Sequence, residues 1–292
     1  MNYTLENNIF KIAITAIGAE ISSFKSKKTG AEYIWQANPE IWGSHAPVLF
    51  PIVGGLKNDT YIHLGKKYQL PRHGFIRRNK SLKIIEKSSS SILLELLSSS
   101  QTLEIYPFSF SFQIQFTLIK NKLIVKHRIM NTGENDLFFS LGAHPAFNCP
   151  FDKNEQYDDY FLQFETNESL NTWDLNNEGL ISYEAQKMIN NTDILHLHST
   201  IFNKDALIFK SLKSREVKLK SRNHHKEVII RFNDFSSLGL WAKPNADFVC
   251  IEPWLGYADN ENTSQIFSEK EGIIKLAAHR EYTATYSIEI ND

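Results

Sequence analysis

The chain has 292 residues, 42% of them hydrophobic, so it is long enough to bury a large core. Its 32 basic and 33 acidic side chains give a formal net charge of -1, which argues against a nucleic acid partner because polyanion binders carry a basic excess. Residues 210–226 are rich in lysine and arginine but also alternate with apolar residues, and we interpret them as a solvated pair of strands.

The sequence also lacks the patterns of exported and membrane-bound proteins. Its first residues are polar and do not form a signal peptide. No stretch reaches the roughly 18 consecutive apolar residues of a membrane helix. Cys149 and Cys250 are too few for a disulfide framework, and we expect them to be buried free thiols. We therefore predict a cytoplasmic protein without a membrane partner.

In chain order, most of the sequence alternates apolar and polar residues with the period of a β-strand. The longest alternation puts the apolar side chains from Phe108 to Leu118 on one face. The predicted strands are residues 10–14, 92–97, 108–118, 122–130, 227–232 and 283–290. Turn signals occur at residues 28–30, 88–91, 131–135 and 176–179. The only helical candidate is a short turn around residues 39–42.

These patterns predict an all-β chain that forms one domain over residues 1–292. We find no linker rich in proline, glycine and serine, and no repeat of fixed period. Antiparallel strands that alternate in this way bury one face and expose the other. Two such sheets packed face to face make a sandwich. The predicted architecture is a large antiparallel β-sandwich.

Two histidines lie where proton chemistry is plausible. His144 follows an apolar run and is fixed by Pro145, and its unperturbed pKa near 6.5 suits proton transfer at neutral pH. His73 lies between Arg72 and Gly74, and a glycine there permits close approach of the backbone to a ligand. For His73 alone, a surface loop histidine is an equally good interpretation.

A carboxylate and an aromatic residue follow each other near the C-terminus. Glu252 ends an apolar run, so partial desolvation should raise its pKa toward that of a useful base, although an ion pair at a strand end is the simpler alternative. Trp254 offers a flat apolar surface for a sugar ring. The polar loop of residues 257–262, which contains Asp259, could hydrogen-bond sugar hydroxyls. Each aromatic residue taken alone is more often part of a core.

Together these segments resemble the aldose 1-epimerase (galactose mutarotase) family, in the branch of LacX-like and hexose-6-phosphate 1-epimerase-like proteins. Any one of the matching stretches is a weak motif, but they occur in the family's order across nearly the whole chain. The matching stretches are residues 18–21, 47–51, 72–75, 144–147 and 251–254.

The resemblance implies a sandwich of the galactose mutarotase type with a sugar cleft on one sheet. It implies an isomerase without cofactor or metal that interconverts the α and β anomers of a hexose or hexose phosphate. In the family's scheme Glu252 would be the general base, His144 the general acid and His73 a second histidine at the ring oxygen. The expected partner is a small sugar, and the expected assembly is a monomer or homodimer.

One position departs from the family pattern. Many relatives carry an arginine shortly after the Phe-Pro segment, where this chain has Gly55. Arg72 and Lys57 are the candidates to replace it as anchors of sugar hydroxyls. Arg72, together with residues 77–78, also raises the possibility of a phosphorylated substrate, because guanidinium groups bind phosphate well. Surface solubility is the alternative explanation for residues 77–78.

Three other functions remain open on the sequence alone. A non-catalytic carbohydrate-binding protein of the same fold would keep the sugar contacts without the acid–base set. A glycosidase would need a second carboxylate across the bond, for which Glu20 and Asp259 are candidates. A metal site could be built from His73, His144 and Glu252.

Overall fold

The computed structural model describes residues 2–292, and strands dominate it as the sequence predicts. Its largest unit is a nine-stranded antiparallel sheet. In order across the sheet, the strands are β15 (Ile181–His196), β14 (Tyr160–Leu175), β17 (Glu216–Ser221), β18 (Glu227–Arg231), β22 (Glu281–Asn291), β10 (Lys122–Asn131), β9 (Phe110–Ile119), β8 (Ser91–Leu97) and β7 (Lys83–Lys87).

A second, six-stranded sheet carries Glu252 and Trp254 on one of its central strands. Its strands are β16 (Leu207–Phe209), β19 (Ser237–Trp241), β20 (Phe248–Leu255), β12 (Leu141–Ala143) and β4 (Val48–Leu49), with β13 (Ala146–Asn148) also paired to β20. Three small sheets complete the fold. They are β1 (Asn2–Glu6), β2 (Phe10–Thr15) and β3 (Ile21–Ser26); β5 (Thr60–His63) and β6 (Lys66–Gln69); and β11 (Leu137–Phe139) with β21 (Ile274–Leu276).

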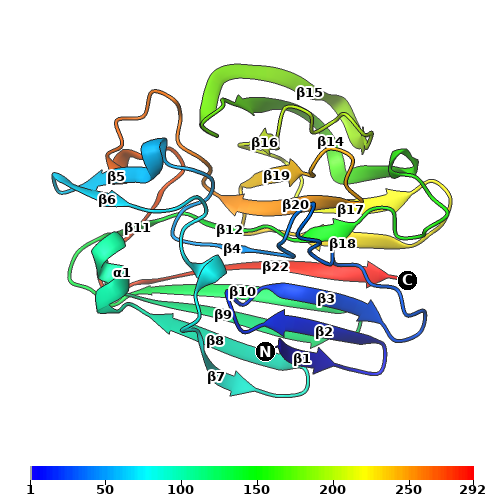
Figure 1. The fold of residues 1–292 in the computed structure, drawn as a ribbon, viewed down its shortest axis with the longest axis horizontal. Coiled ribbons are helices and arrows are strands. Elements are labelled where there is room, and N and C mark those ends of the chain that lie inside the picture. The colour runs from blue at the N-terminus through cyan, green and yellow to red at the C-terminus, as the bar shows by residue number, and fades with distance from the viewer. Residues whose placement is uncertain (1) are drawn as a thin grey trace.

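The two large sheets form successive layers, with β4, β12 and β20 above β22, β10 and β9 in Figure 1. Side chains between the layers build the core. The ring of Phe50, next to β4, packs 4.9 Å from Phe112 and 5.6 Å from Phe110 on β9. The predicted alternation of β9 is confirmed, because its apolar face from Phe110 to Leu118 is buried throughout.

Helices are short and few in the described part of the chain. The α-helix α1 (Ser100–Ile105) was not predicted; the Ser99 side chain caps it by accepting a hydrogen bond from the Thr102 amide. The predicted turn at residues 39–42 is present as a turn rather than a helix. Four 3-10 turns occur at Lys57–Asp59, Ile76–Arg78, Tyr157–Asp159 and Phe267–Glu269. Among residues 2–292, no helix has the length and apolar character needed to cross a bilayer.

Candidate active site

Strand β20 carries Glu252 through the middle of the six-stranded sheet. The strand pairs with β19 on one side and β12 on the other, and all of its residues are buried. Glu252 lies opposite Gly239 and is 1% exposed. The prediction that Glu252 ends its strand is wrong, because pairing continues to Trp254 with β19 and to Leu255 with β12. Its desolvation is correspondingly more complete than a strand end would give.

Trp254, two residues along the same face of β20, lies across glycines of both neighbouring strands. A Cβ at Gly239 would lie 2.4 Å from the indole, and one at Gly142 would lie 2.8 Å from it. These glycines therefore leave the space that the ring occupies. The indole Nε1 is buried without a hydrogen-bond partner among the described residues, and Trp254 lines the cavity above the sheet. The indole also lowers the pKa of Glu252, two residues away, so it lies close enough to that carboxyl group to interact with it.

His144 sits in the short link between β12 and β13, beside Glu252. Its backbone amide donates to the carbonyl of Pro47 at 3.1 Å, which fixes the link against the segment before β4. The imidazole Nε2 lies 3.3 Å from Oε2 of Glu252. Trp42 stacks on the ring with a centroid distance of 5.1 Å. The structure thus brings together the two residues that the sequence predicts as acid and base.

His73 joins the same cluster through an unusual backbone conformation. Its φ is +66°, and Gly74 follows at +70°. A Cβ at Gly74 would lie 2.1 Å from the carbonyl oxygen of Phe50, so only glycine fits there. Nδ1 of His73 accepts a hydrogen bond from the Gly54 amide at 3.1 Å, so the proton of the neutral ring is on Nε2. The His73 and His144 rings meet edge to face at 5.5 Å.

These side chains surround a cavity of about 230 Å³, which is below the usual size of drug-binding pockets and suits a smaller ligand. Sequence reasoning missed Asp205 and Trp241 in its wall, because nothing in their local sequence marks them as functional. Asp205 has a φ of +95°, the kind of strain that is common at binding sites. The lining residues are Trp42, Gly54, Arg72, His73, Arg77, His144, Leu175, Gly179, Asp205, Ala206, Ile208, Trp241, Glu252, Trp254 and Ala258.

Burial controls the ionisation of the cluster. It raises the pKa of Glu252 well above its usual range; the Trp254 side chain and the charge of Arg77 oppose this rise, and the charge of Asp205 adds to it. Burial lowers the pKa of His144 to about 3, and Arg77 acts in the same direction. Burial also lowers the pKa of His73 well below its usual value. At neutral pH both rings are neutral, and any proton held by the Glu252–His144 pair resides on the carboxyl group.

Arg72 lies where it can replace the side chain that Gly55 lacks. Its guanidinium packs over two glycines: a Cβ at Gly55 would lie 3.8 Å from it, and one at Gly179 would collide with it at 1.6 Å. The Lys57 side chain points to a different group, because its ammonium donates a hydrogen bond to the backbone carbonyl of Glu261 at 2.7 Å. Arg72 is therefore the anchor that the geometry favours.

The structure does not bring Asp259 to the cavity wall. One of its carboxylate oxygens pairs with the buried ammonium of Lys270 at 2.9 Å, and the other accepts the amide of Lys57 at 3.0 Å. Glu20 is likewise occupied, since it accepts the amides of His45 and Ala46 at 2.6 and 2.8 Å. Neither carboxylate considered for a glycosidase lines the cavity, and we assign Asp259 no sugar contact.

Among the residues that the structure describes, one group of side chains is close enough to share a metal ion. Its donor atoms come from His144, Cys250 and Glu252 and lie within 4.8 Å of one another. His73, which the sequence suggested as the third ligand, is not in the group. Cys250 and Cys149 are both buried and free, as predicted.

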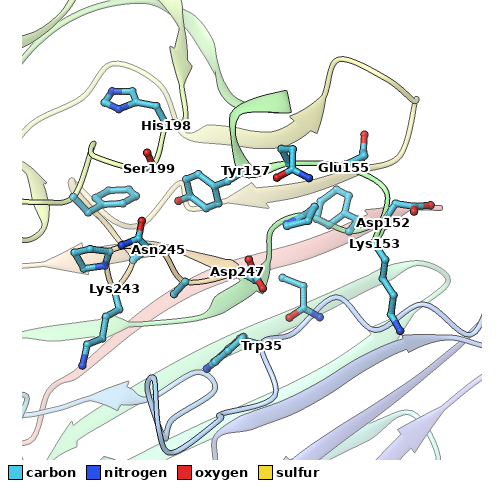
Figure 2. Close-up of a pocket in the computed structure, with 18 residues that line it drawn as sticks. Trp35, Asp152, Lys153, Glu155, Tyr157, His198, Ser199, Lys243, Asn245 and Asp247 are labelled. Atoms are coloured by element: carbon cyan, nitrogen blue, oxygen red, sulfur yellow. The ribbon is translucent and has the colours of Figure 1, made fainter.

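A second hollow of about 540 Å³ lies between the Tyr157–Asp159 turn and the turn before β20. Figure 2 shows its polar wall, with Tyr157, Asn245 and Asp247 among the labelled side chains. Acidic and basic residues are mixed there, and neither His144 nor Glu252 reaches it. The smaller cavity therefore remains the candidate active site.

Fold and site together define an all-β sandwich protein with a histidine–carboxylate cluster buried in a small cavity. The chain belongs to the aldose 1-epimerase family, whose model matches residues 1–288. It is similar to the plasmid-encoded protein LacX of Lactococcus lactis subsp. lactis, with 31% identity over 299 residues and 99% of each chain covered.

Solved structures agree with this assignment. A galactose mutarotase related enzyme from Lactobacillus acidophilus is 35% identical and superposes with a TM-score of 0.94, covering 100% of this chain and 98% of the other. A galactose mutarotase-like protein from Lactobacillus casei is 26% identical, with a TM-score of 0.94 and 100% of both chains covered. The predicted fold of the galactose mutarotase type is thereby confirmed.

Proposed function

We propose that this chain is an aldose 1-epimerase that interconverts the α and β anomers of a hexose or hexose phosphate, with Glu252 as base and His144 as acid. The observation that carries the proposal is the 3.3 Å approach of His144 Nε2 to Glu252 Oε2 in the wall of a small cavity. Family membership supports the reaction class. The geometry supports the proposed pair of proton-transfer groups.

The reaction moves one proton off the substrate and one onto it. Glu252 takes the proton from the hydroxyl group on C1, and His144 gives a proton to the ring oxygen as the C1–O5 bond breaks. The open-chain aldehyde then rotates about C1–C2. Closure on the other face reverses both transfers, so the enzyme returns to its starting state. General acid–base catalysis of this kind contributes roughly 10²–10⁴-fold.

The reactive form of the pair has an ionised Glu252 and a protonated His144. It contains one proton, as does the resting form in which burial keeps that proton on Glu252. Moving it to His144 therefore requires no exchange with solvent. The two groups titrate as a coupled pair, and the active protonation state is available over the pH range in which the pair holds a single proton.

The remaining cavity residues suit a sugar. His73 has its Nε2 proton free to donate to the ring oxygen or a neighbouring hydroxyl. Trp254 offers its indole N–H, and Asp205 a carboxylate acceptor. Neither Arg72 nor Arg77 forms a salt bridge within residues 2–292. Unpaired guanidinium groups in the wall favour the phosphorylated sugars within the proposed substrate class.

Anomer exchange measured by polarimetry or NMR tests the proposal on free hexoses and hexose 6-phosphates. The wild-type protein should accelerate exchange for at least one sugar, and exhaustive chelation should leave the rate unchanged. Glu252→Gln should lose the acceleration by roughly 10²–10⁴-fold. Glu134→Gln, at an exposed surface site, is the control and should keep the wild-type rate.

The same measurements separate the enzyme from a non-catalytic sugar-binding protein. Sugar binding without acceleration over buffer would support the binding protein and reject the epimerase. A Glu252→Gln variant with a near-normal rate would reject the base assignment.

A further inference from the structure

The buried side of the active site holds a third donor group that the proposed reaction does not use. Cys250 lies two residues before Glu252 on β20, so both side chains point to the same face of the sheet. The Cys250 sulfur, a carboxylate oxygen of Glu252 and a ring nitrogen of His144 all lie within 4.8 Å of one another. Cys250 is not part of the cavity lining, whereas the other two are. The thiol is therefore a buried neighbour of His144 and Glu252 and not part of the cavity wall.

A second observation concerns Oε2 of Glu252. This oxygen is buried and makes no hydrogen bond among the described residues, and His144 Nε2 is the only group that forms an ion-pair contact with it there. A carboxylate oxygen that is buried without a hydrogen bond is unfavourable in the ionised form. A cation bound beside it would remove that cost.

The donor set and its spacing suit zinc. Thiolate, imidazole and carboxylate are the ligands that Zn²⁺ prefers, and catalytic-type sites use three of them with one open position. With bonds of about 2.0–2.3 Å, the ligand atoms of a tetrahedral site lie roughly 3.3–3.8 Å apart. His144 Nε2 and Glu252 Oε2 already have this separation, at 3.3 Å. The Cys250 sulfur lies within 4.8 Å of the ligand atoms of the other two residues.

The local charges are compatible with a divalent cation. A thiolate and a carboxylate together neutralise Zn²⁺, and both the thiol proton and the proton held on Glu252 pass to solvent as the Zn–S and Zn–O bonds form. Asp205 adds negative charge near Glu252, whereas Arg77 works against a cation. His144 and Glu252 both line the cavity, so an ion could reach them from there.

We propose that His144, Cys250 and Glu252 form a Zn²⁺ site whose occupation blocks the active centre. Zinc bound there occupies the lone pairs of Nε2 and Oε2, the two atoms assigned to proton transfer. The binding site stands on geometry alone, and its inhibitory effect rests on the proposed epimerase function.

Cobalt titration of the full chain tests the site directly, because Co²⁺ bound to a thiolate gives a near-ultraviolet charge-transfer band. Wild-type protein should show the band at one ion per chain, and Zn²⁺ should abolish it. Cys250→Ser should lose the band. Cys149→Ser, which alters the other buried cysteine, should keep it. His224→Gln should also keep it, which separates the site from the His224–Glu155 pair.

Zinc affinity measured by calorimetry gives a second reading. Loss of a residue that only hydrogen-bonds to a metal ligand weakens metal binding roughly 10–100-fold. Loss of Cys250, which would bind the ion directly, should weaken zinc binding by more than this. Cys250→Ala replaces the serine variant if that does not fold. Wild-type protein without the thiolate band, or a band that survives in a Cys250 variant, would overturn the site whatever the other variants do.

Anomer exchange then tests the inhibition. Zn²⁺ should slow the wild-type reaction, a chelator should restore it, and the Cys250 variant should be less sensitive relative to its own uninhibited rate. A protein that shows the thiolate band but no anomer exchange would refute the epimerase and leave the metal site intact. An active enzyme whose rate ignores saturating Zn²⁺ would refute the inhibitory role.

Discussion

The side chains that matter most in this cavity share one property, which is that each keeps a polar atom without a protein partner. Nδ1 of His144, Oε2 of Glu252 and Nε1 of Trp254 are all buried and free among the described residues. Buried polar atoms in a folded protein are nearly always paired, so a convergent set of unpaired ones indicates a site prepared for a ligand. Of these atoms, Oε2 of Glu252 is the one that both the proposed reaction and the zinc site would use.

His144→Asn separates chemistry from binding at the residue scale. Asparagine keeps a hydrogen-bonding group but cannot donate a proton as an acid, so kcat for anomer exchange should fall roughly 10²–10⁴-fold. KM should change little, because the anchors Arg72 and Trp254 remain. Steady-state NMR exchange rates over a range of sugar concentrations measure both. His198→Asn, at an exposed position, should behave as wild type; a His144→Asn variant with unchanged kcat would remove His144 as the acid.

Arg72→Met tests the anchor that replaces a side chain at Gly55. A charge-assisted hydrogen bond contributes about 1.5–3 kcal/mol, so KM for a hexose 6-phosphate should rise at least roughly tenfold. The matched control is Arg78→Met, because Arg78 is exposed and does not line the cavity. Equal effects of the two substitutions on KM would show that general surface charge, rather than a defined contact, is responsible.

At the scale of elements, Gly74→Ala probes how the turn after β6 places His73. The new Cβ would lie 2.1 Å from the Phe50 carbonyl oxygen at a φ of +70°, so the turn must move. We expect a loss of at least about 1–3 kcal/mol in unfolding free energy, together with reduced activity. Gly65→Ala has a φ of +74° but nothing within 4 Å of its new Cβ. Urea unfolding of both should show a smaller loss for Gly65→Ala and no loss of its activity.

Most of the fold could be predicted from strand periodicity. The strands of a sandwich bury one face, so apolar and polar residues alternate along them. β9 and β10 alternate cleanly over ten residues each, and both were located from sequence. Helix α1 has only six residues, too few for a recognisable helical period, and its Ser99 cap is an isolated signal. The strand β20 was judged too short because Glu252 and Pro253 look like a strand end, although both are buried inside a paired strand.

The candidate site was harder to predict from the sequence than the fold, because its residues come from segments that are far apart in the chain. His73, His144 and Glu252 each lie next to a proline or glycine that made them visible. Asp205 lies in an irregular turn before β16, where no local pattern distinguishes it from other surface aspartates. Asp259 looked like a sugar ligand until its pairing with the distant Lys270 was known.

For the whole molecule, buried histidines make stability depend on pH. Burial lowers the pKa of His127 from 6.5 to about 4 and that of His144 to about 3. The unfolded chain therefore binds more protons than the folded one below pH 6.5, and stability is lost as pH falls through this window. Glu252 has the opposite sign, because its raised pKa makes the folded state bind more protons above pH 4.5. Its contribution therefore declines as pH rises.

His127 isolates the acid effect from the active site, because it lies in the core of the sandwich between the rings of Phe112, Phe235 and Tyr286. A pKa of about 4 in place of 6.5 corresponds to roughly 3 kcal/mol that is present above pH 6.5 and lost by pH 4. His127→Leu removes the titrating group, so the fall in unfolding free energy between pH 7 and pH 4 should shrink by about that amount. Urea unfolding at a series of pH values measures it. His279→Leu, at an exposed histidine, should leave the slope unchanged, and an unaltered slope in His127→Leu would assign the acid sensitivity to other groups.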